Sequence, residues 1–429
     1  MNTRQSEIIS LIKKEVKPAL GCTEPIAVAL AASKAVELLR QTGYQEDDFT
    51  LEVKVSGNIL KNGMGVGIPG TDMIGLDIAA ALGGLCGNSS YGLEVLNDIN
   101  DHAISQAKEM HRKKMVKIGI AETDLKLYVK VDAVTERHHT WAIIERDHDN
   151  IVETGIDGKS ERVEVSEDEK SKSNRDYNLT LKEIYSFPDD LDFEDIKFIL
   201  ESRTLNLRLA QEGLKGSYGL NVGRTIADEQ MKEVFGNDFM SYAMSLTAAA
   251  SDARMAGCTL AAMSNSGSGN QGITVTMPVI AYAEKYGISD QELARALIIA
   301  HLVAIHIKSY LGKLSALCGC VIASTGASCG IVYLRGGNYD HACAAIKNMV
   351  GNITGMVCDG AKVGCAMKVA SGVSSAIQSA VLAMKGHCIS EHEGIIEKDI
   401  EKTIRNLGQI GSVGMAATDN MILDIMVCK

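Results

Sequence analysis

The sequence predicts an α+β fold in which a mostly helical bundle is joined to a smaller domain with an antiparallel sheet. Apolar residues recur with the helical period of 3.6 almost everywhere after residue 178, whereas strict alternation is confined to residues 48–168. The C-terminal part is rich in Ala, Gly, Ser and Met, and aromatic residues make up 4% of the chain. Close helix contacts and methionine must therefore fill the core.

Length and charge favour small-molecule chemistry. With 429 residues, 46% of them hydrophobic, the chain can bury a large core and should divide into two or more domains. It carries 54 acidic and 43 basic residues, for a net charge of -11, so we expect no binding to nucleic acid or to anionic membranes. Self-association into a homo-oligomer is left open by the sequence.

The start of the chain and its thiols predict a cytoplasmic protein. Residues 1–14 carry Arg4, Glu7, Lys13 and Lys14, unlike a secretory signal. Eleven cysteines in such a chain indicate reduced thiols, catalysis or metal ligation rather than disulfides. The apolar stretch 293–307 contains an arginine and two histidines and falls short of the roughly 20 residues of a membrane span, so we predict a buried helix.

Residues 1–45 are predicted to form two helices that pack on the helical bundle. Apolar residues with helical spacing lie on both sides of the turn Gly21-Cys22-Thr23-Glu24-Pro25. The turn should therefore be held from both sides.

Residues 46–170 are predicted to form the smaller domain. A strand at Leu51–Val55 runs into a glycine-rich loop at residues 63–70, and a helical pair follows over 75–115. Three further strands are expected over 125–134, 139–147 and 150–154.

Charged, Ser and Asn residues dominate the segment 166–178, which predicts an exposed linker. We therefore place a domain boundary near residue 170. Residues 171–429 are predicted to form the helical domain.

Cys22 is predicted to lie at the start of a helix, where the helix dipole favours a thiolate. Such a thiolate could act as a base or a nucleophile. The alternative is a small buried residue at a sharp turn, since Thr23 and Pro25 are ordinary helix-start residues.

Residues 264–272, Ser-Asn-Ser-Gly-Ser-Gly-Asn-Gln-Gly, form a loop of amides and hydroxyls ahead of an apolar helix. Backbone amides at a helix start would suit a carboxylate, although the loop lacks the lysine of a nucleotide P-loop and no strand is predicted before it. A flexible surface loop is the alternative reading.

The helical stretch after residue 300 carries polar candidates. His301 and His306 are five positions apart, which does not align them as a metal pair. Lys308 and Lys313 could reach an anionic substrate, although lysines are usually solvated. Lys308 is retained as a candidate.

Cys318, Cys320, Cys358 and Cys365 occur within 48 residues, among several glycines. Soft thiolates select iron-sulfur clusters or zinc. The spacings match neither structural zinc knuckles nor a ferredoxin motif. Buried core cysteines are the metal-free alternative.

These motifs together resemble the family of L-cysteine desulfidases, bacterial and archaeal proteins related to the iron-sulfur L-serine dehydratases. The resemblance covers most of the chain and is carried by five segments: Gly-Cys-Thr-Glu-Pro at 21–25, Asn-Ser-Gly-Ser-Gly-Asn-Gln-Gly at 265–272, Leu-Cys-Gly-Cys at 317–320, Gly-Ala-Ser-Cys-Gly at 326–330 and Met-Val-Cys-Asp-Gly-Ala-Lys-Val-Gly-Cys at 356–365.

The resemblance implies a 4Fe-4S cluster held by three cysteines, of which Cys358 and Cys365 match the last two. For the first ligand it favours Cys320, with Cys318 as the alternate. The Cys320 to Cys358 interval is shorter than is usual in the family. The interval between the last two cysteines is shorter than in serine dehydratases, which favours the desulfidase branch.

The resemblance further makes Cys22 the proton acceptor and makes residues 265–272 the substrate-binding loop, with Asn265, Ser266, Gly267, Ser268 and Asn270 as candidate contacts. It implies a lyase that converts L-cysteine to pyruvate, ammonia and sulfide without pyridoxal phosphate, with residues 171–429 as the cluster-binding catalytic domain. L-Serine dehydratase, a noncatalytic cluster-bearing amino-acid sensor and a metal-free structural protein are the rival hypotheses.

Overall fold

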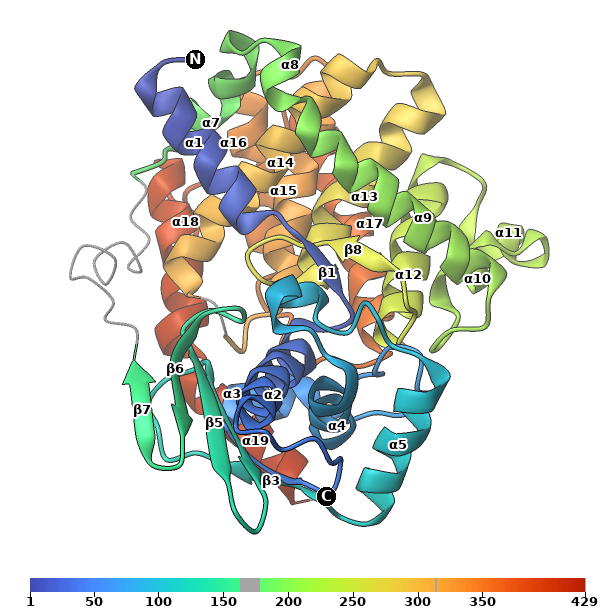
Figure 1. Cartoon of the computed structure of the whole chain (residues 1–429). Helices are drawn as coiled ribbons and strands as arrows, with labels where there is room; N and C mark the ends of the chain where they lie inside the picture. The colour runs from blue at the N-terminus through green and yellow to red at the C-terminus, as the bar shows by residue number, and fades with distance from the viewer. Residues whose placement is uncertain (163–177, 313–314, 429) are drawn as a thin grey trace.

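The chain forms a helical body and a smaller body built on a sheet, which confirms the predicted α+β class (Figure 1). The computed structural model describes residues 1–162, 178–312 and 315–428. The expected linker and the boundary near residue 170 fall almost wholly on residues 163–177, outside the described residues. The division at residues 45 and 170 therefore stays a prediction.

The smaller body contains a six-stranded sheet in the order β3-β2-β4-β5-β6-β7. Its strands are β2 (Thr50–Val55), β3 (Val116–Ile120), β4 (Tyr128–Val134), β5 (His139–Glu145), β6 (Ile151–Ile156) and β7 (Lys159–Arg162). Alternate residues of β2 are buried, because neighbours on a strand point to opposite faces. The pairings are antiparallel as predicted, except that β3 runs parallel to β2. The sheet is therefore mixed because of β3, whereas the strands expected over 125–154 pair antiparallel as predicted.

Helices α2 (Thr23–Gln41) and α4 (Leu76–Cys86) share one hydrophobic core with this sheet. The two helices cross closely because Gly83 has no side chain: a Cβ there would lie 2.1 Å from the carbonyl oxygen of Ala29. The smaller body also contains α3 (Gly57–Gly63), the 3-10 helix η1 (Ser89–Glu94) and α5 (Asp101–Arg112). The helical pair predicted over 75–115 corresponds to α4 and α5.

The helical body is built mainly on longer helices, several of which are rich in small residues. They are α9 (Glu201–Lys215), α12 (Phe239–Met255), α13 (Gly269–Tyr286), α14 (Asp290–Leu311), α15 (Gly319–Leu334), α16 (Tyr339–Ile353), α17 (Cys365–Met384) and α18 (Ile400–Gln409). Shorter elements complete it: α7 (Leu181–Ser186), η2 (Phe187–Asp190), α8 (Phe193–Ile196), η3 (Lys197–Leu200), α10 (Val222–Ala227), η4 (Glu229–Met231), α11 (Lys232–Phe235) and the π-helical turn η5 (Ile410–Gly414).

Helix α14 confirms the predicted buried helix. Among the described residues it is the single unbroken helix long and apolar enough to cross a membrane, and 83% of its most apolar window is buried inside the protein. The bent pair formed by residues 400–414 and α19 (Ala416–Val427) passes the same test only when counted as one span.

The two ends of the chain connect the bodies. Helix α1 (Thr3–Glu15) packs in the helical core, β1 (Pro18–Leu20) pairs antiparallel with β8 (Ala261–Met263), and α2 then enters the smaller body. At the other end α19 lies against α3, where Asn58 Nδ2 donates to Asp419 Oδ2 at 2.6 Å. The helices expected around the Gly21–Pro25 turn are thus present, but each packs in a different core.

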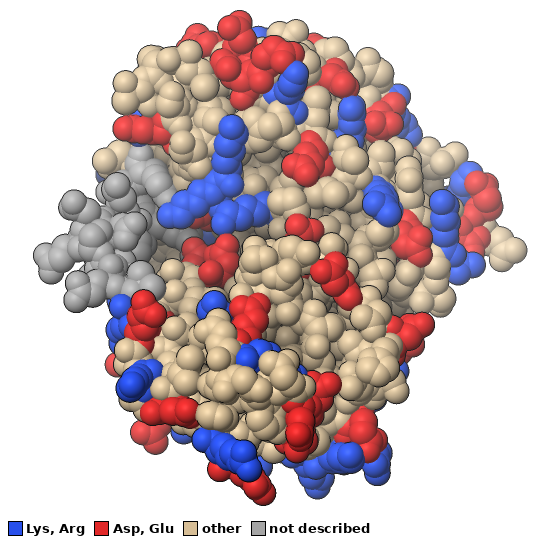
Figure 2. Space-filling view, in the orientation of Figure 1, with Lys and Arg blue, Asp and Glu red and all other residues tan. Residues whose placement is uncertain are grey.

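Figure 2 shows acidic and basic side chains interspersed over one face of the molecule. Over the described part of that face, no continuous stripe of one sign is seen. The expectation that the chain avoids nucleic acid is compatible with this surface and stays a prediction.

Candidate active site

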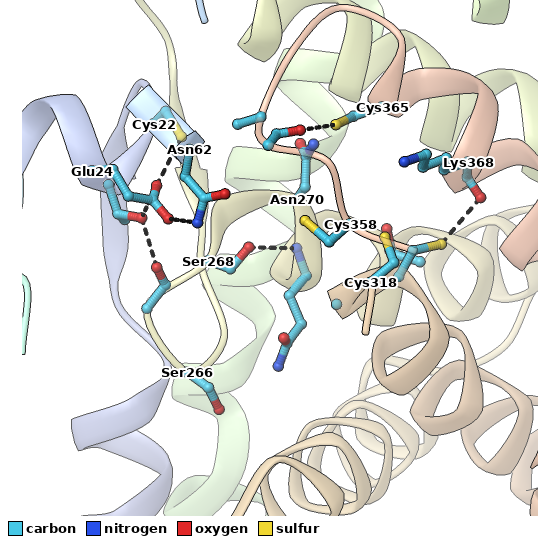
Figure 3. Close-up of a pocket in the computed structure, with 18 of the residues that line it drawn as sticks. Cys22, Glu24, Asn62, Ser266, Ser268, Asn270, Cys318, Cys358, Cys365 and Lys368 are labelled. Atoms are coloured by element: carbon cyan, nitrogen blue, oxygen red, sulfur yellow. Dashed lines mark hydrogen bonds between the residues drawn. The ribbon is translucent and has the colours of Figure 1, made fainter. Parts of the chain in front are cut away.

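A hollow lies between the two bodies, and with its opening it has a volume of about 820 Å³. Its walls come from the β1–α2 turn, α3, the β5–β6 turn, α12, the loop before α13, α14 and the segments around Cys318 and Cys358. Figure 3 shows Cys22, Glu24 and Asn62 on one side and the cysteines from the C-terminal part on the other.

Four helices begin at this hollow. Cys22 is the N-cap of α2, Ser268 of α13, Cys318 of α15 and Gly364 of α17. The N-terminus of a helix carries a partial positive charge and amide donors that lack helical acceptors. Their convergence favours anionic groups in the hollow.

Cys22 lies in a turn that needs glycine before it. Gly21 has φ +69°, and a Cβ there would lie 2.9 Å from Pro69 Cγ. The Cys22 side chain is 4% exposed, and its Sγ donates a hydrogen bond to Glu24 Oε2 at 3.1 Å. Burial and the charge of Glu24 together raise the pKa of Cys22 well above its ordinary value. In this state the thiol therefore holds its proton.

Glu24 is the ionised partner of that thiol. It accepts from Asn62 Nδ2 at 3.0 Å and from Thr23 Oγ1 at 3.1 Å, and its Oε1 lies 4.0 Å from His148 Nε2. Burial would raise the pKa of Glu24, but the charge of His148 and the hydrogen bond from Cys22 outweigh it and hold the pKa below its ordinary value. The pair can pass a proton between sulfur and carboxylate.

The loop at 264–272 follows β8 directly, so the expectation of no strand before it is corrected. Ser266 and Gly267 adopt positive φ, and the Gly267 carbonyl accepts from Thr23 Oγ1 at 2.7 Å. Ser268 Oγ accepts from Gln271 N at 3.3 Å as the cap of α13. These contacts hold the loop against the Cys22 turn and oppose the reading as a flexible surface loop.

Asn265 lies behind the wall rather than on it. It is fully buried, its Nδ2 contacts His301 Nδ1 at 2.9 Å, and its Oδ1 accepts from Gln271 Nε2 at 2.7 Å. Burial lowers the pKa of His301 to about 3, so the ring is neutral and can accept from Asn265. This chain of contacts orients Gln271, which lines the hollow.

Cys318 and Cys358 lie on neighbouring extended segments. Cys318 N donates to Met356 O at 3.0 Å, and Cys358 N donates to Ala316 O at 2.7 Å. The proximity of the Cys318 thiol, with the charges of Lys61 and Lys368, lowers the pKa of Cys358 below its ordinary value despite burial. A thiolate is the form that binds metal.

Cys320 and Cys365 also line the hollow but differ in their contacts. Cys320 Sγ donates to the Lys368 carbonyl at 3.1 Å and packs where a Cβ on Gly372 would lie 2.4 Å from it. Burial raises the pKa of Cys320 to about 12. Cys365 Sγ lies 3.8 Å from Gly360 O, and burial raises its pKa. The Cys320 thiol thus already has a hydrogen-bond acceptor, and it packs in the contact between α15 and α17.

The donor set fits an iron-sulfur cluster better than a single ion. Within residues 1–162, 178–312 and 315–428, no three His, Cys, Asp or Glu side chains come close enough to hold one metal ion. A four-iron cluster is wider than one ion, so its ligand sulfurs stand farther apart. Several cysteines around one hollow, with lysines and helix N-termini nearby, suit such a cluster.

The structure brings almost all the predicted site residues together. Those on the hollow are Cys22, Ser266, Gly267, Ser268, Asn270, Lys308, Cys318, Cys320, Cys358 and Cys365. Lys308 is 6% exposed rather than solvated, whereas Lys313 lies outside the described residues. Of the substrate, catalytic and cluster candidates that the structure describes, Asn265 alone does not line it.

Sequence reasoning missed several polar residues on the same walls, namely Glu24, Asn62, His148, Arg254, Gln271 and Lys368. Glu24 and Gln271 belong to motifs that were recognised but received no role. Arg254 is the one basic residue of an otherwise Ala- and Ser-rich helix, which could have singled it out. The sequence around His148 carries no comparable signal.

The chain is similar in sequence to known proteins over nearly its whole length. The family model described as serine dehydratase alpha chain matches residues 90–424. Among curated relatives, the UPF0597 protein of Parabacteroides distasonis is 47% identical over 99% of this chain and 98% of its own length. The proteins of that name from Bacteroides thetaiotaomicron (47%, covering 100% and 99%) and Oleidesulfovibrio alaskensis (49%, covering 99% and 98%) are similar in the same way.

Proposed function

The chain belongs to the serine dehydratase alpha chain family, and on that premise we propose that it is a lyase that removes the β-substituent of a small L-amino acid, with L-cysteine as the preferred substrate. One observation carries the proposal: a single hollow holds a buried thiol–carboxylate pair on one side and a group of cysteines on the other. The first can accept a proton, and the second can hold a Lewis acid.

Cys318, Cys358 and Cys365 would hold a 4Fe-4S cluster. The contact between Cys318 and Cys358 supports Cys318 as the first ligand, in preference to the Cys320 expected from the sequence, whose thiol is already bonded to a helix carbonyl. When bound, a cluster with three protein ligands supplies an open iron that acts as a Lewis acid toward the leaving group.

Cys22 would accept the α-proton at Sγ, and Glu24 would hold the proton that the thiol gives up. The 3.1 Å contact between Cys22 Sγ and Glu24 Oε2 supports this division, because it gives the thiol proton a direct acceptor. Asn62 and Thr23 keep the carboxylate oriented toward the thiol.

The loop at 265–272 would exclude water and position the substrate. Ser266, Gly267, Ser268 and Asn270 of this loop line the hollow together with the cysteines. Removal of the α-proton and departure of hydrosulfide leave aminoacrylate, which tautomerises and hydrolyses to pyruvate and ammonia. Each turnover consumes one water and requires no external oxidant.

L-Serine is the second candidate substrate, because loss of hydroxide instead of hydrosulfide follows the same steps. The family name favours it, whereas the seven-position interval between Cys358 and Cys365 favours the desulfidase branch through the resemblance described above.

Replacing Cys22 tests the proposal. Anaerobically purified Cys22→Ser should retain iron and acid-labile sulfide but form no pyruvate from L-cysteine. The matched control is Cys329→Ser, a fully buried cysteine of α15 that does not line the hollow. A Cys22→Ser protein with unchanged turnover would contradict the assignment of the proton acceptor.

A further inference from the structure

Arg254 is a buried cation with no carboxylate in direct contact, although its charge acts through space on Glu24 and Cys22. It lies near the end of α12, is 2% exposed and lines the hollow. Its Nη1 donates to Asn270 Oδ1 at 3.2 Å, whereas its Nε has no hydrogen-bond partner. Among the described residues no carboxylate lies within 4 Å of the guanidinium, although buried charges are ordinarily paired.

The position of Arg254 against the start of α13 favours a bound anion. A Cβ on Gly269 would lie 2.2 Å from Arg254 Nε, so the guanidinium packs against the first residue of α13. A positive side chain is unfavourable at the positive end of a helix, unless an anion neutralises both. Glycine at position 269 makes this arrangement sterically possible.

Two hydrogen-bond acceptors on residues that line the hollow also lack partners. Asn62 Oδ1 and Gln271 Oε1 are buried acceptors without a hydrogen bond. Their orientation is fixed, because Asn62 Nδ2 donates to Glu24 and Gln271 Nε2 donates to Asn265. The residues that line the hollow thus contain one buried donor atom of a cation and two buried acceptor atoms without partners, which complement the carboxylate and the ammonium group of an α-amino acid.

We propose that Arg254 binds the α-carboxylate of the substrate, and that the amide oxygens of Asn62 and Gln271 accept hydrogen bonds from its α-ammonium group. The inference rests on the proposed function for the reaction and adds the recognition of the substrate class. It makes Arg254 the residue that separates amino acids from amines and thiols without a carboxylate.

Binding measurements test the proposal without turnover. L-Alanine has no leaving group, and L-alaninamide replaces its carboxylate with a neutral amide. Calorimetric titration of the anaerobic holoprotein should show that it binds L-alanine more tightly than L-alaninamide. Arg254→Gln should lose this preference and bind L-alanine roughly 10- to 100-fold more weakly, because a charge-assisted hydrogen-bonded pair is lost. Arg254→Lys, which keeps the charge but not the fork, should recover part of the affinity.

Arg295→Gln is the matched control, because the Arg295 Nε is also buried without a partner but lies on α14 away from the hollow. It should bind both ligands as the unsubstituted protein does. An unchanged preference for L-alanine in Arg254→Gln, or no preference in the unsubstituted protein, would overturn the proposal. So would loss of iron from Arg254→Gln, since Arg254 would then serve the cluster.

Failure of the proposed function has a different signature. Preference for L-alanine that depends on Arg254, combined with no pyruvate from L-cysteine or L-serine, would support carboxylate binding and reject catalysis. Pyruvate formation with no dependence of alanine binding on Arg254 would reject the carboxylate assignment alone.

Discussion

The thiol of Cys22 is hydrogen-bonded to the carboxylate of Glu24, two residues farther along the start of α2. Both groups are buried, and their pKa values are displaced in opposite directions, with that of Cys22 raised and that of Glu24 lowered. The resting pair is therefore a thiol beside a carboxylate. This relationship leads to two predictions about the rate.

Glu24→Gln should lower kcat by about 10²-fold, because the thiol proton loses its acceptor. Iron content should be unchanged. Glu37→Gln on the same helix, where the carboxylate binds Ser89 away from the hollow, is the control and should have little effect. If Glu24 merely raised the pKa of Cys22, its removal would make Glu24→Gln faster at neutral pH, which is the contrary result.

The rate should change little with pH around neutrality. The pKa of Cys22 is raised and that of Glu24 is lowered, so the pair holds one proton over this range, and its transfer from sulfur to carboxylate needs no exchange with solvent. We expect kcat/KM to vary by less than about threefold between about pH 6 and pH 8. β-Chloro-L-alanine, whose side chain does not titrate, separates this effect from ionisation of the L-cysteine thiol. A rate that rises about tenfold per pH unit over this range would contradict Glu24 as the holder of the thiol proton.

Cys318→Ser and Cys320→Ser form a matched pair for the cluster. Cys318 contacts Cys358, whereas Cys320 donates to the Lys368 carbonyl. Cys318→Ser should lose most of its iron and its activity, whereas Cys320→Ser should keep both. Analysis of iron and acid-labile sulfide in the two anaerobic preparations distinguishes Cys318 from Cys320 as the first ligand. The reverse pattern would identify Cys320 as the ligand.

Gly83→Ala should destabilise the smaller body. The added methyl would lie 2.1 Å from Ala29 O, and backbone at a helix crossing cannot move aside cheaply. We expect the free energy of unfolding to fall by about 2 kcal/mol, measured by urea denaturation. Gly355→Ala, whose Cβ would meet no atom within 4 Å, should change it by less than about 0.5 kcal/mol. Equal effects would argue against the tight α2–α4 contact.

The sequence predicted those elements in which the spacing of apolar residues alone identifies a strand or a helix. Alternation identified β2, β4, β5 and β6, and the apolar run at 293–307 identified the buried helix that extends over 290–311. Strand β3 was not predicted, because it is five residues long and pairs in parallel with β2 from far earlier in the chain. Short runs become strands through such distant partners, which a local pattern does not reveal.

The site could be predicted where residues form motifs. Cys22, the loop at 265–272 and the C-terminal cysteines were found, and the structure places them around one hollow. The sequence could not separate the roles of Cys318 and Cys320. Both residues lie at the start of α15, and the direction in which each thiol points depends on the exact position where the helix begins. Arg254 was missed because arginine is usually exposed, and its burial depends on Gly269 from another segment.

The most direct test of the proposed reaction is pyruvate and sulfide release from L-cysteine by anaerobically purified protein whose iron and acid-labile sulfide have been quantified, with L-serine assayed in parallel. We expect the protein to contain the cluster, to form pyruvate and sulfide in equal amounts and to prefer L-cysteine. A protein that contains the cluster but forms no pyruvate from either amino acid would contradict the proposed reaction.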